Sequence, residues 1–283
     1  MKVGLVLEGG AMRGLFTAGV LDIMLENNIN VDGIIGVSAG ALFGANYFSK
    51  QKGRVIRYST RYANDKRYIS ALNLILTGNA VSKRFAYYKV QMKLDRFDNE
   101  QFMKENKQFI AVATDIESGM PTYFNITNPF EDMEKLRSSS AMPLASRIIK
   151  INAHKYLDGG VSDAIPFVKM QELGYDKIII ILTQPLGYQK RQVGKKKLAK
   201  MEKKYRHYPN FMHTVKTWYK NYNEQLKQIA SLEKQGKCFV IRPNEKITVD
   251  LICRDCTKLE QIYQMGVDEA QKQIDKLKKY LEN

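Results

Sequence analysis

The sequence has no apolar run long enough to cross a membrane. A membrane-spanning helix needs about 20 consecutive apolar residues, and no run among these 283 residues approaches that length. The apolar run at the N-terminus is shorter than the core of a signal peptide, and glycines interrupt it. We therefore expect a cytoplasmic protein.

Cysteine is scarce as well. Three cysteines, Cys238, Cys253 and Cys256, are too few for a disulfide framework. Cys253 and Cys256 have the spacing of half a zinc site or of a redox pair, but no second pair of this kind occurs. The pattern favours plain thiols over a zinc or redox role, and we expect neither a metal ion nor a cofactor.

Acidic residues are outnumbered by basic ones, 29 to 45, which gives a net charge of +16 at pH 7. The excess is concentrated in residues 50–67 and 189–207, which carry seven and nine Lys or Arg and one acid each. Such charge favours anionic partners, either a phospholipid surface or nucleic acid. The simplest interpretation of both runs is a solvated basic face.

Apolar strands alternate with helices through the first 185 residues. Strands are expected at 3–7, 33–38, 108–116 and 176–185, and helices at 14–28, 39–50 and 167–175. This alternation predicts an α/β fold with a mainly parallel central sheet and helices on both faces. Residues 120–127 are expected to pair beside the strand at 108–116.

The composition becomes basic after Pro185, and we draw a soft domain boundary near Gly187. Residues 1–187 would form the main domain. Residues 188–283 would form a small α/β extension of helix, strand and helix, with helices near 223–235 and 267–283 and the strand at 237–243. The apolar stretch at 68–76 is interpreted as ordinary core or, less favourably, as part of an acyl pocket.

A glycine-rich loop, EGGAMRG at residues 8–14, follows the first strand and opens a helix. Backbone N–H groups at such a place can bind the pyrophosphate of a dinucleotide or a developing oxyanion. The dinucleotide fingerprint requires a third glycine where Ala11 stands and an acid at the end of the second strand, which ends in Ser38. The oxyanion interpretation is therefore favoured.

Ser38 lies in the sequence GVSAG, between a strand and a helix. A serine on so sharp a turn is crowded by the positions two before and two after it, and Gly36 and Gly40 occupy both. The positive end of the following helix dipole would favour an anionic intermediate. The motif is moderately specific for a nucleophile, because a tight glycine turn can also serve packing alone.

A serine nucleophile needs a base, and histidine is a poor candidate here. His154, His207 and His213 have no glycine-loop setting, and we interpret them as structural or surface residues. Asp158 follows a predicted strand in the sequence LDGG, where Gly159 and Gly160 allow the loop to approach another backbone. Taken alone, this sequence would be an ordinary Asp-Gly turn.

The three motifs, in this order and at this spacing, resemble the patatin-like phospholipase family. The stretch SSSAMPLAS at 138–146 and its continuation through the aspartate are similar to that family too. The resemblance covers about residues 3–185 and implies a three-layer fold, and the tail is similar to an extension found in one bacterial subgroup. Ala11 departs from the family, which most often has a third glycine there.

By this resemblance, Ser38 would be the nucleophile and Asp158 the general base of a Ser-Asp dyad. The oxyanion hole would be built by backbone N–H groups of the loop that contains Gly9, Gly10, Ala11, Met12, Arg13 and Gly14. No metal is required, because the dyad and the hole supply proton transfer and charge stabilisation.

Two functions remain open. The favoured one is a serine acyl hydrolase that acts on phospholipids or related lipids, with its basic residues in peripheral contact with an anionic membrane. The alternative is a non-enzymatic regulatory or nucleic-acid-binding protein on the same fold, with Tyr205, Tyr208 and Trp218 as stacking groups. No nucleic-acid-binding motif occurs, so no nucleic acid is expected. The basic residues of 190–206 are expected to lie away from a substrate beside Ser38.

Overall fold

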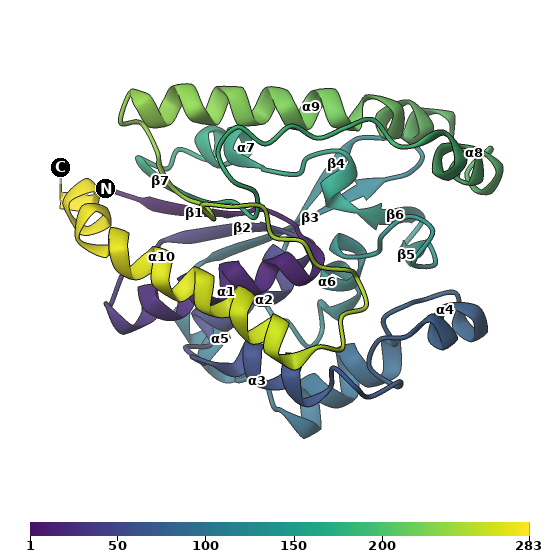
Figure 1. Cartoon of the computed structure of the whole chain (residues 1–283), viewed down its shortest axis with the longest axis horizontal. Coiled ribbons are helices and arrows are strands. Elements are labelled where there is room, and N and C mark those ends of the chain that lie inside the picture. Colours follow the sequence, from purple (N-terminus) through teal and green to yellow (C-terminus); the bar gives the residue numbers. More distant parts are fainter. Residues whose placement is uncertain (283) are drawn as a thin grey trace.

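A single sheet runs through the centre of the molecule (Figure 1). The computed structural model describes residues 1–282, and within them the sheet has eight strands in the order β5-β6-β3-β2-β1-β7-β8, with β4 on β3. The strands are β1 (Val3–Leu7), β2 (Gly33–Val37), β3 (Gln108–Asp115), β4 (Pro121–Asn125), β5 (Ile149–Ile151), β6 (His154–Asp158), β7 (Lys177–Ile181) and β8 (Phe239–Ile241).

The sheet is mainly parallel, as the sequence predicts. Strands β3, β2, β1, β7 and β8 pair in parallel, whereas β4, β5 and β6 are antiparallel to their neighbours. The expected pairing of residues 120–127 beside 108–116 is confirmed by β4. The parallel strands β1 and β2 therefore end at the same edge of the sheet, where the glycine-rich loop and Ser38 follow them.

Helices cover both faces of the sheet (Figure 1). Alternate strand residues feed two separate cores, so that Leu5 and Leu7 pack on one face and Val6 on the other. The helices of the first face are α1 (Gly14–Glu26), α2 (Ala39–Phe48), α3 (Arg54–Arg61), α5 (Asn99–Glu105) and α10 (Cys256–Glu282), and those of the second are α7 (Phe167–Glu172) and α9 (Pro209–Lys234). This is the three-layer α/β arrangement that the sequence analysis expects.

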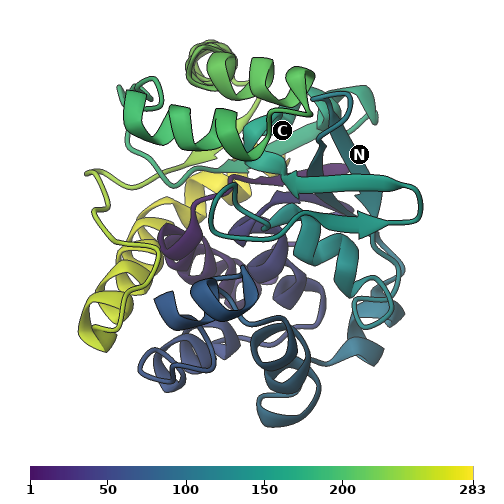
Figure 2. The same cartoon turned by 90° about the vertical axis from the view of Figure 1, so that its right-hand side faces the viewer.

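The remaining helical elements lie mostly around one end of the sheet. They are η1 (Ala11–Arg13), α4 (Ala71–Thr77), the π-helix η2 (Lys83–Leu94), α6 (Met133–Ser139), η3 (Gly159–Val161) and α8 (Lys195–Lys204). Figure 2 views the molecule from the end at which α4 and α8 lie, the right-hand side of Figure 1.

Residues 188–282 are built into these layers. Strand β8 extends the central sheet beside β7, α9 covers one face and α10 covers α1 on the other. The segment holds three helices where the sequence analysis expects two, and α9 and α10 begin well before the predicted starts at 223 and 267. The division near Gly187 stays a prediction about domains, while in space both parts share one sheet.

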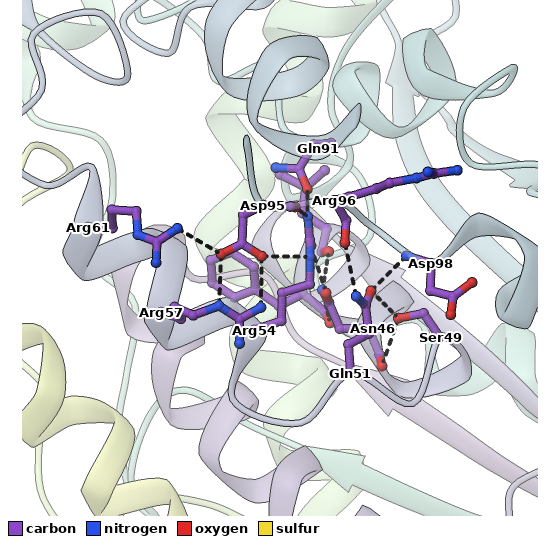
Figure 3. A network of polar contacts seen from close by, with 12 residues as sticks. Asn46, Ser49, Gln51, Arg54, Arg57, Arg61, Gln91, Asp95, Arg96 and Asp98 are labelled. Carbon is purple, nitrogen blue, oxygen red and sulfur yellow. Dashed lines mark hydrogen bonds and ion pairs between the residues drawn. The ribbon is translucent and has the colours of Figure 1, made fainter. Parts of the chain in front are cut away.

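The basic run at 50–67 is not simply a solvated face, which corrects the sequence-based interpretation. The Arg54 side chain is 1% exposed, and its Nε lies 3.3 Å from Oδ1 of Asp95. Its Nη1 donates to Oδ1 of Asn46 at 2.9 Å, and Arg57 also pairs with Asp95 (Figure 3). Burial lowers the pKa of Arg54. The network ties α2, α3 and the end of η2 together.

The apolar stretch at 68–76 is not ordinary core over most of its length. Tyr68 begins it inside the protein, but in α4 the side chains of Leu72, Ile75 and Leu76 are 52%, 79% and 69% exposed. A bridge between Ile69 and Val81 closes the base of this excursion. None of the helices within residues 1–282 is long and apolar enough to span a membrane.

The contact between α1 and α10 generates a prediction. A Cβ added at Gly266 would lie 2.0 Å from the backbone oxygen of Phe16, so Gly266→Ala must push the two helices apart. We expect it to lower the free energy of unfolding by about 1–3 kcal/mol, as measured by urea denaturation. Gly194→Ala is the matched control, because nothing lies within 4 Å of that added Cβ. Wild-type stability of Gly266→Ala would contradict the tight docking of α10.

Candidate active site

Ser38 occupies a strained turn between β2 and α2. Its backbone angles are φ 54° and ψ −121°, a conformation that costs a residue with a side chain of the order of 1–3 kcal/mol. A Cβ at Gly36 would lie 2.7 Å from the backbone nitrogen of Ala41, and one at Gly40 would lie 2.6 Å from the carbonyl oxygen of Leu7. Only glycine fits at either position, as the GVSAG motif predicts.

Ser38 and Asp158 meet although 120 residues separate them. The Ser38 Oγ donates a hydrogen bond to Oδ2 of Asp158 at 2.8 Å, in a buried setting. Asp158 ends β6, which pairs with β3 next to the strand that carries Ser38. Its other carboxylate oxygen accepts the N–H of Gly160 at 2.8 Å, and the Ser38 N–H donates to Oγ of Ser139 at 2.9 Å. Both side chains are thereby held in fixed orientations.

Burial changes the acid strength of Asp158. It raises the pKa of the carboxyl from 3.8 to about 6, although hydrogen bonds from Gly160 and Ser38 and the charge of Lys190 oppose the rise. The carboxylate is therefore ionised at neutral pH, yet it is a stronger base than an ordinary aspartate. This combination suits a general base that takes a proton from a serine without an intervening histidine.

The histidines do not take part in this site. His154 is an exposed residue beside Asp115, and His207 and His213 are exposed as well. None of the three lines either of the cavities that reach Ser38. The interpretation of these residues as surface residues is confirmed.

The glycine-rich loop lies directly against the serine. A Cβ added at Gly9 would be 3.2 Å from the Cβ of Ser38. Within residues 1–282, the four N–H groups from Gly9 to Met12 have no hydrogen-bond acceptor, whereas those of Arg13 and Gly14 donate to the carbonyls of Gly10 and Ala11. The first part of the loop therefore has backbone N–H groups that are free to bind an oxyanion. The N–H groups of Arg13 and Gly14 are used within the η1 turn itself.

Ala11 itself has a φ of 48°, which is the left-handed region that favours glycine. This conformation accounts for the preference for a third glycine at the position where this sequence has alanine. The alanine holds the required backbone shape at a conformational cost, so its N–H remains usable.

A buried carboxylate fixes the loop from behind. Glu8 is 1% exposed, and its Oε2 accepts the N–H of Thr183 at 2.6 Å while its Oε1 accepts the hydroxyl of Tyr222 at 2.6 Å. Tyr222 belongs to α9, so the segment beyond residue 187 helps to position the loop. The sequence analysis missed Thr183 and Tyr222, because no local motif signals a contact between residues 8 and 222.

Two cavities meet at Ser38, and both also touch Ala11, Met142 and Leu251. The first has a volume of about 130 Å³ and a mainly apolar wall. Its lining includes Leu42, Phe43, Tyr58, Tyr68, Ile69, Tyr87, Phe130 and Leu136. The expectation that residues near 68 could line an apolar pocket is confirmed for Tyr68 and Ile69.

The second cavity is larger, about 390 Å³, and its mainly apolar wall includes five charged side chains. Asp158 and Glu8 contribute carboxylates, and Arg13, Lys190 and Lys197 contribute cations. The expectation that the basic residues of 190–206 lie away from the serine is therefore wrong for Lys190 and Lys197. The polypeptide after β7 turns back over the carboxyl edge of the sheet, which sequence distance alone does not reveal.

The cysteines form no bridge. Cys238 and Cys253 are buried free thiols, and the Sγ of Cys256 contacts the carbonyl oxygen of Thr60 at 3.5 Å. Within the part of the chain that the structure describes, no group of three or more His, Cys, Asp or Glu side chains could hold a metal ion.

Comparison with known families gives two matches. Residues 5–169, more than half of the chain, match the family described as Patatin-like phospholipase. Residues 208–282 match a Domain of unknown function (DUF6363). The second match covers α9, β8 and α10, which complete the layers around the first.

Several curated proteins are similar to this chain. The uncharacterized protein YjjU of Escherichia coli is 31% identical over 188 residues, which cover 65% of this chain and 52% of that protein. Lysophospholipase NTE1 of Kluyveromyces lactis is 28% identical over 188 residues, 61% of this chain and 12% of that protein. The protein of the same name from Scheffersomyces stipitis is 26% identical over 293 residues, 95% and 18% of the two chains.

This chain thus spans about half of the bacterial relative and less than a fifth of either yeast relative. Among solved structures, VipD from Legionella pneumophila aligns over 97% of this chain and 67% of its own, with a TM-score of 0.45 and 14% identity.

The raised pKa of Asp158 predicts how the reactivity of Ser38 depends on pH. Only the ionised carboxylate can take the serine proton, and it becomes protonated as the pH falls through about 6. The rate at which a fluorophosphonate labels Ser38 should therefore be constant above about pH 7 and fall toward tenfold per unit below pH 6. A midpoint near pH 4, or labelling at another serine, would contradict this assignment.

Proposed function

The chain belongs to the patatin-like phospholipase family, and on that basis we propose that it is a serine acyl hydrolase that cleaves ester bonds of phospholipids or related lipids. The observation that carries the proposal is the 2.8 Å hydrogen bond from Ser38 to a buried Asp158. It lies where an apolar cavity and a cationic cavity meet. Family membership supports a lipid hydrolase, and the dyad is our assignment.

In the proposed reaction, Asp158 takes the proton of Ser38 as its Oγ attacks the carbonyl carbon of the ester. The oxyanion that forms would be stabilised by N–H groups of the glycine-rich loop, whose free donors run from Gly9 to Met12. The bond to the alcohol then breaks, and the alcohol oxygen receives the proton from Asp158. A water molecule, activated by the same carboxylate, hydrolyses the acyl-enzyme and releases the fatty acid.

The alternative, a nucleic-acid-binding protein, loses two of its three stacking groups. Tyr205 is fully buried against Phe211, and its hydroxyl accepts the N–H of Leu144. The indole of Trp218 is covered by Lys190, whose Nζ lies 3.9 Å from the ring centroid. Neither ring is free to stack on a base. The absence of a nucleic-acid partner stays a prediction.

Substitution of the dyad tests the proposed function. Ser38→Ala and Asp158→Asn should each reduce kcat/KM for short-chain esters and lysophospholipids by at least about 10²–10⁴-fold. Asp163→Asn is the matched control. Asp163 is also buried, bonded to Tyr123 and Gln225, and its pKa is also raised, but it lines neither cavity that reaches Ser38.

Stability separates chemistry from folding in the same variants. Burial raises the pKa of Asp158, so its ionised form destabilises the folded state above about pH 6. Asp158→Asn should therefore keep or raise the melting temperature at pH 8. Near-wild-type turnover in either dyad variant, at full stability, would remove the Ser-Asp assignment.

We also propose that the protein contacts anionic membranes through α4 and α8. The apolar side chains of α4 protrude next to segments that line the apolar cavity. Arg147 packs at Gly78, just after α4, and Lys204 of α8 donates to the carbonyl of Ser146. An apolar tip and a basic helix thus lie at the same end of the molecule, on either side of the segment that holds residues 146–147 (Figure 1, Figure 2). This pairing matches an anionic bilayer in hydrophobicity and in charge.

Vesicle co-sedimentation tests this surface. Ile75→Ser with Leu76→Ser should weaken binding to anionic vesicles at least tenfold, because each buried apolar side chain contributes about 1.5–3 kcal/mol. A triple variant should weaken the part of vesicle binding that depends on salt concentration. It carries Lys195→Gln, Lys196→Gln and Lys200→Gln. Lys197 is left intact because it lines the cavity at Ser38.

The control for these changes is Val168→Ser, an exposed apolar side chain on α7. We expect it to leave vesicle binding at the wild-type level. Equal binding of the α4 variant and the wild type, or no binding by the wild type, would overturn this docking surface.

A further inference from the structure

The larger cavity beside Ser38 is lined by three cations and two carboxylates, which leaves an excess of positive charge. We propose that Lys190, together with Arg13 and Lys197, binds the phosphate on the alcohol side of the substrate. The substrate class is then a lysophospholipid or phospholipid rather than a neutral glyceride, and the segment after residue 187 supplies the headgroup site. This inference rests on the proposed acyl hydrolase function.

The two carboxylates of the cavity are already engaged. Asp158 is bonded to Ser38 and Gly160, and Glu8 to Thr183 and Tyr222. Within residues 1–282, none of the three cations forms an ion pair with a carboxylate, and Arg13 makes one long bond, 3.4 Å, to Oγ1 of Thr183. The cavity is therefore a site for an anion that the protein itself does not supply.

Lys190 is held in place at both ends. Its backbone N–H donates to Oδ1 of Asn223, and its carbonyl accepts from the same side chain. Its Nζ lies 3.9 Å and 4.6 Å from the ring centroids of Trp218 and Tyr222 on α9. The rings hold a cation without neutralising it. The buried Nε1–H of Trp218, beside Lys190, has no hydrogen-bond acceptor among the described residues.

Burial opposes the charge of Lys190 in the absence of an anion. It lowers the pKa of the ammonium to about 8. The positive charges of Arg13 and Lys197 add to this lowering of the pKa, whereas the negative charges of Glu8 and Asp158 oppose it. A phosphate in the cavity would reverse this balance, because an anion nearby favours the charged form. A phosphate therefore stabilises the ammonium of the buried Lys190 more than it would stabilise that of a lysine in water.

The position of the ester explains why this anion belongs to the alcohol side. Ser38 lies at the meeting point of the two cavities. If the acyl chain fills the apolar cavity, the alcohol must leave toward the cationic one. In a glycerophospholipid the phosphate is attached to that alcohol. A neutral glyceride would bring no anion to the three cations.

Two of the three cations of this site lie outside the part of the chain that matches the patatin-like phospholipase family. Residues 5–169 carry Arg13, Ser38 and Asp158. Lys190 and Lys197 follow the family match, and Trp218 and Tyr222 lie in the region of unknown function at 208–282. A role in headgroup recognition is thus assigned to a segment that the family does not describe.

Steady-state kinetics test the inference on two substrates with the same short acyl chain, a lysophosphatidylglycerol and a monoacylglycerol, both below their critical micelle concentrations. The quantity measured is the ratio of kcat/KM for the first to kcat/KM for the second. We expect Lys190→Met to lower this ratio about 10- to 100-fold, mainly through KM, because a hydrogen bond to a charged group contributes about 1.5–3 kcal/mol. Lys190→Met could also change the reactivity of Asp158, but such a change would alter kcat/KM equally for both substrates and so leave the ratio unchanged.

Two matched variants complete the design. Lys220→Met removes an exposed lysine of α9 that lines neither cavity, and it should keep the wild-type ratio. Lys190→Arg keeps the charge and should retain most of the preference for the phosphate-bearing substrate. A ratio that Lys190→Met leaves unchanged would overturn the inference, as would equal losses on both substrates. Absence of any Ser38-dependent turnover in the wild type would instead refute the proposed function.

Binding without turnover gives an independent reading. Trp218 is the only tryptophan of the chain, so its fluorescence reports on the environment of Lys190. In Ser38→Ala protein, glycerol 3-phosphate should change this fluorescence saturably, whereas glycerol should leave it unchanged. Adding Lys190→Met to that protein should lower the apparent affinity for glycerol 3-phosphate at least tenfold. A response to glycerol 3-phosphate that survives Lys190→Met would contradict the site. A response to inorganic phosphate alone, with no change in the kinetic ratio, would mean a free-anion site and overturn the headgroup assignment.

Discussion

The hydrogen bond between Ser38 and the buried Asp158 is the interaction on which the rest of the site depends. A carboxylate that serves as the base without a histidine must touch the serine, and burial must raise its pKa into a useful range. Both conditions hold here, with 2.8 Å between the oxygens and a pKa of about 6. The glycines at 36 and 40 permit the turn that presents Ser38 to this carboxylate.

Burial of charge near the serine has a cost that the surrounding structure must offset. Glu8, Asp158 and Lys190 all lie around one cavity. Helix α9 holds Glu8 through Tyr222 and Lys190 through Asn223, and the N–H of Gly160 holds Asp158. The hydroxyl of Tyr222 reaches Glu8 from α9, and the ring of the same residue supports Lys190. The C-terminal segment is therefore part of the construction of the site, as well as of the sheet through β8.

The two cavities differ in the charge that they place around the serine. The apolar one is walled by aromatic and aliphatic side chains, and the Arg54 network braces the helices behind it (Figure 3). The other places cations close to Ser38 and Asp158. A lipid ester has the same division, with an acyl chain on one side of the carbonyl and a polar alcohol on the other. This correspondence favours a lipid hydrolase over a protein that only binds anionic partners.

The sequence by itself determined the local features of this protein. The strained turn at Ser38, the glycine-rich loop, the aspartate in LDGG and the mainly parallel sheet follow from backbone geometry and hydrophobic periodicity, which act over a few residues. Tertiary structure alone decided the burial of Arg54, the exposure of α4, the entry of β8 into the sheet and the return of Lys190 to the serine. Each of these depends on contacts between distant segments, and a basic or apolar run has the same sequence whether its partner is water or another part of the chain.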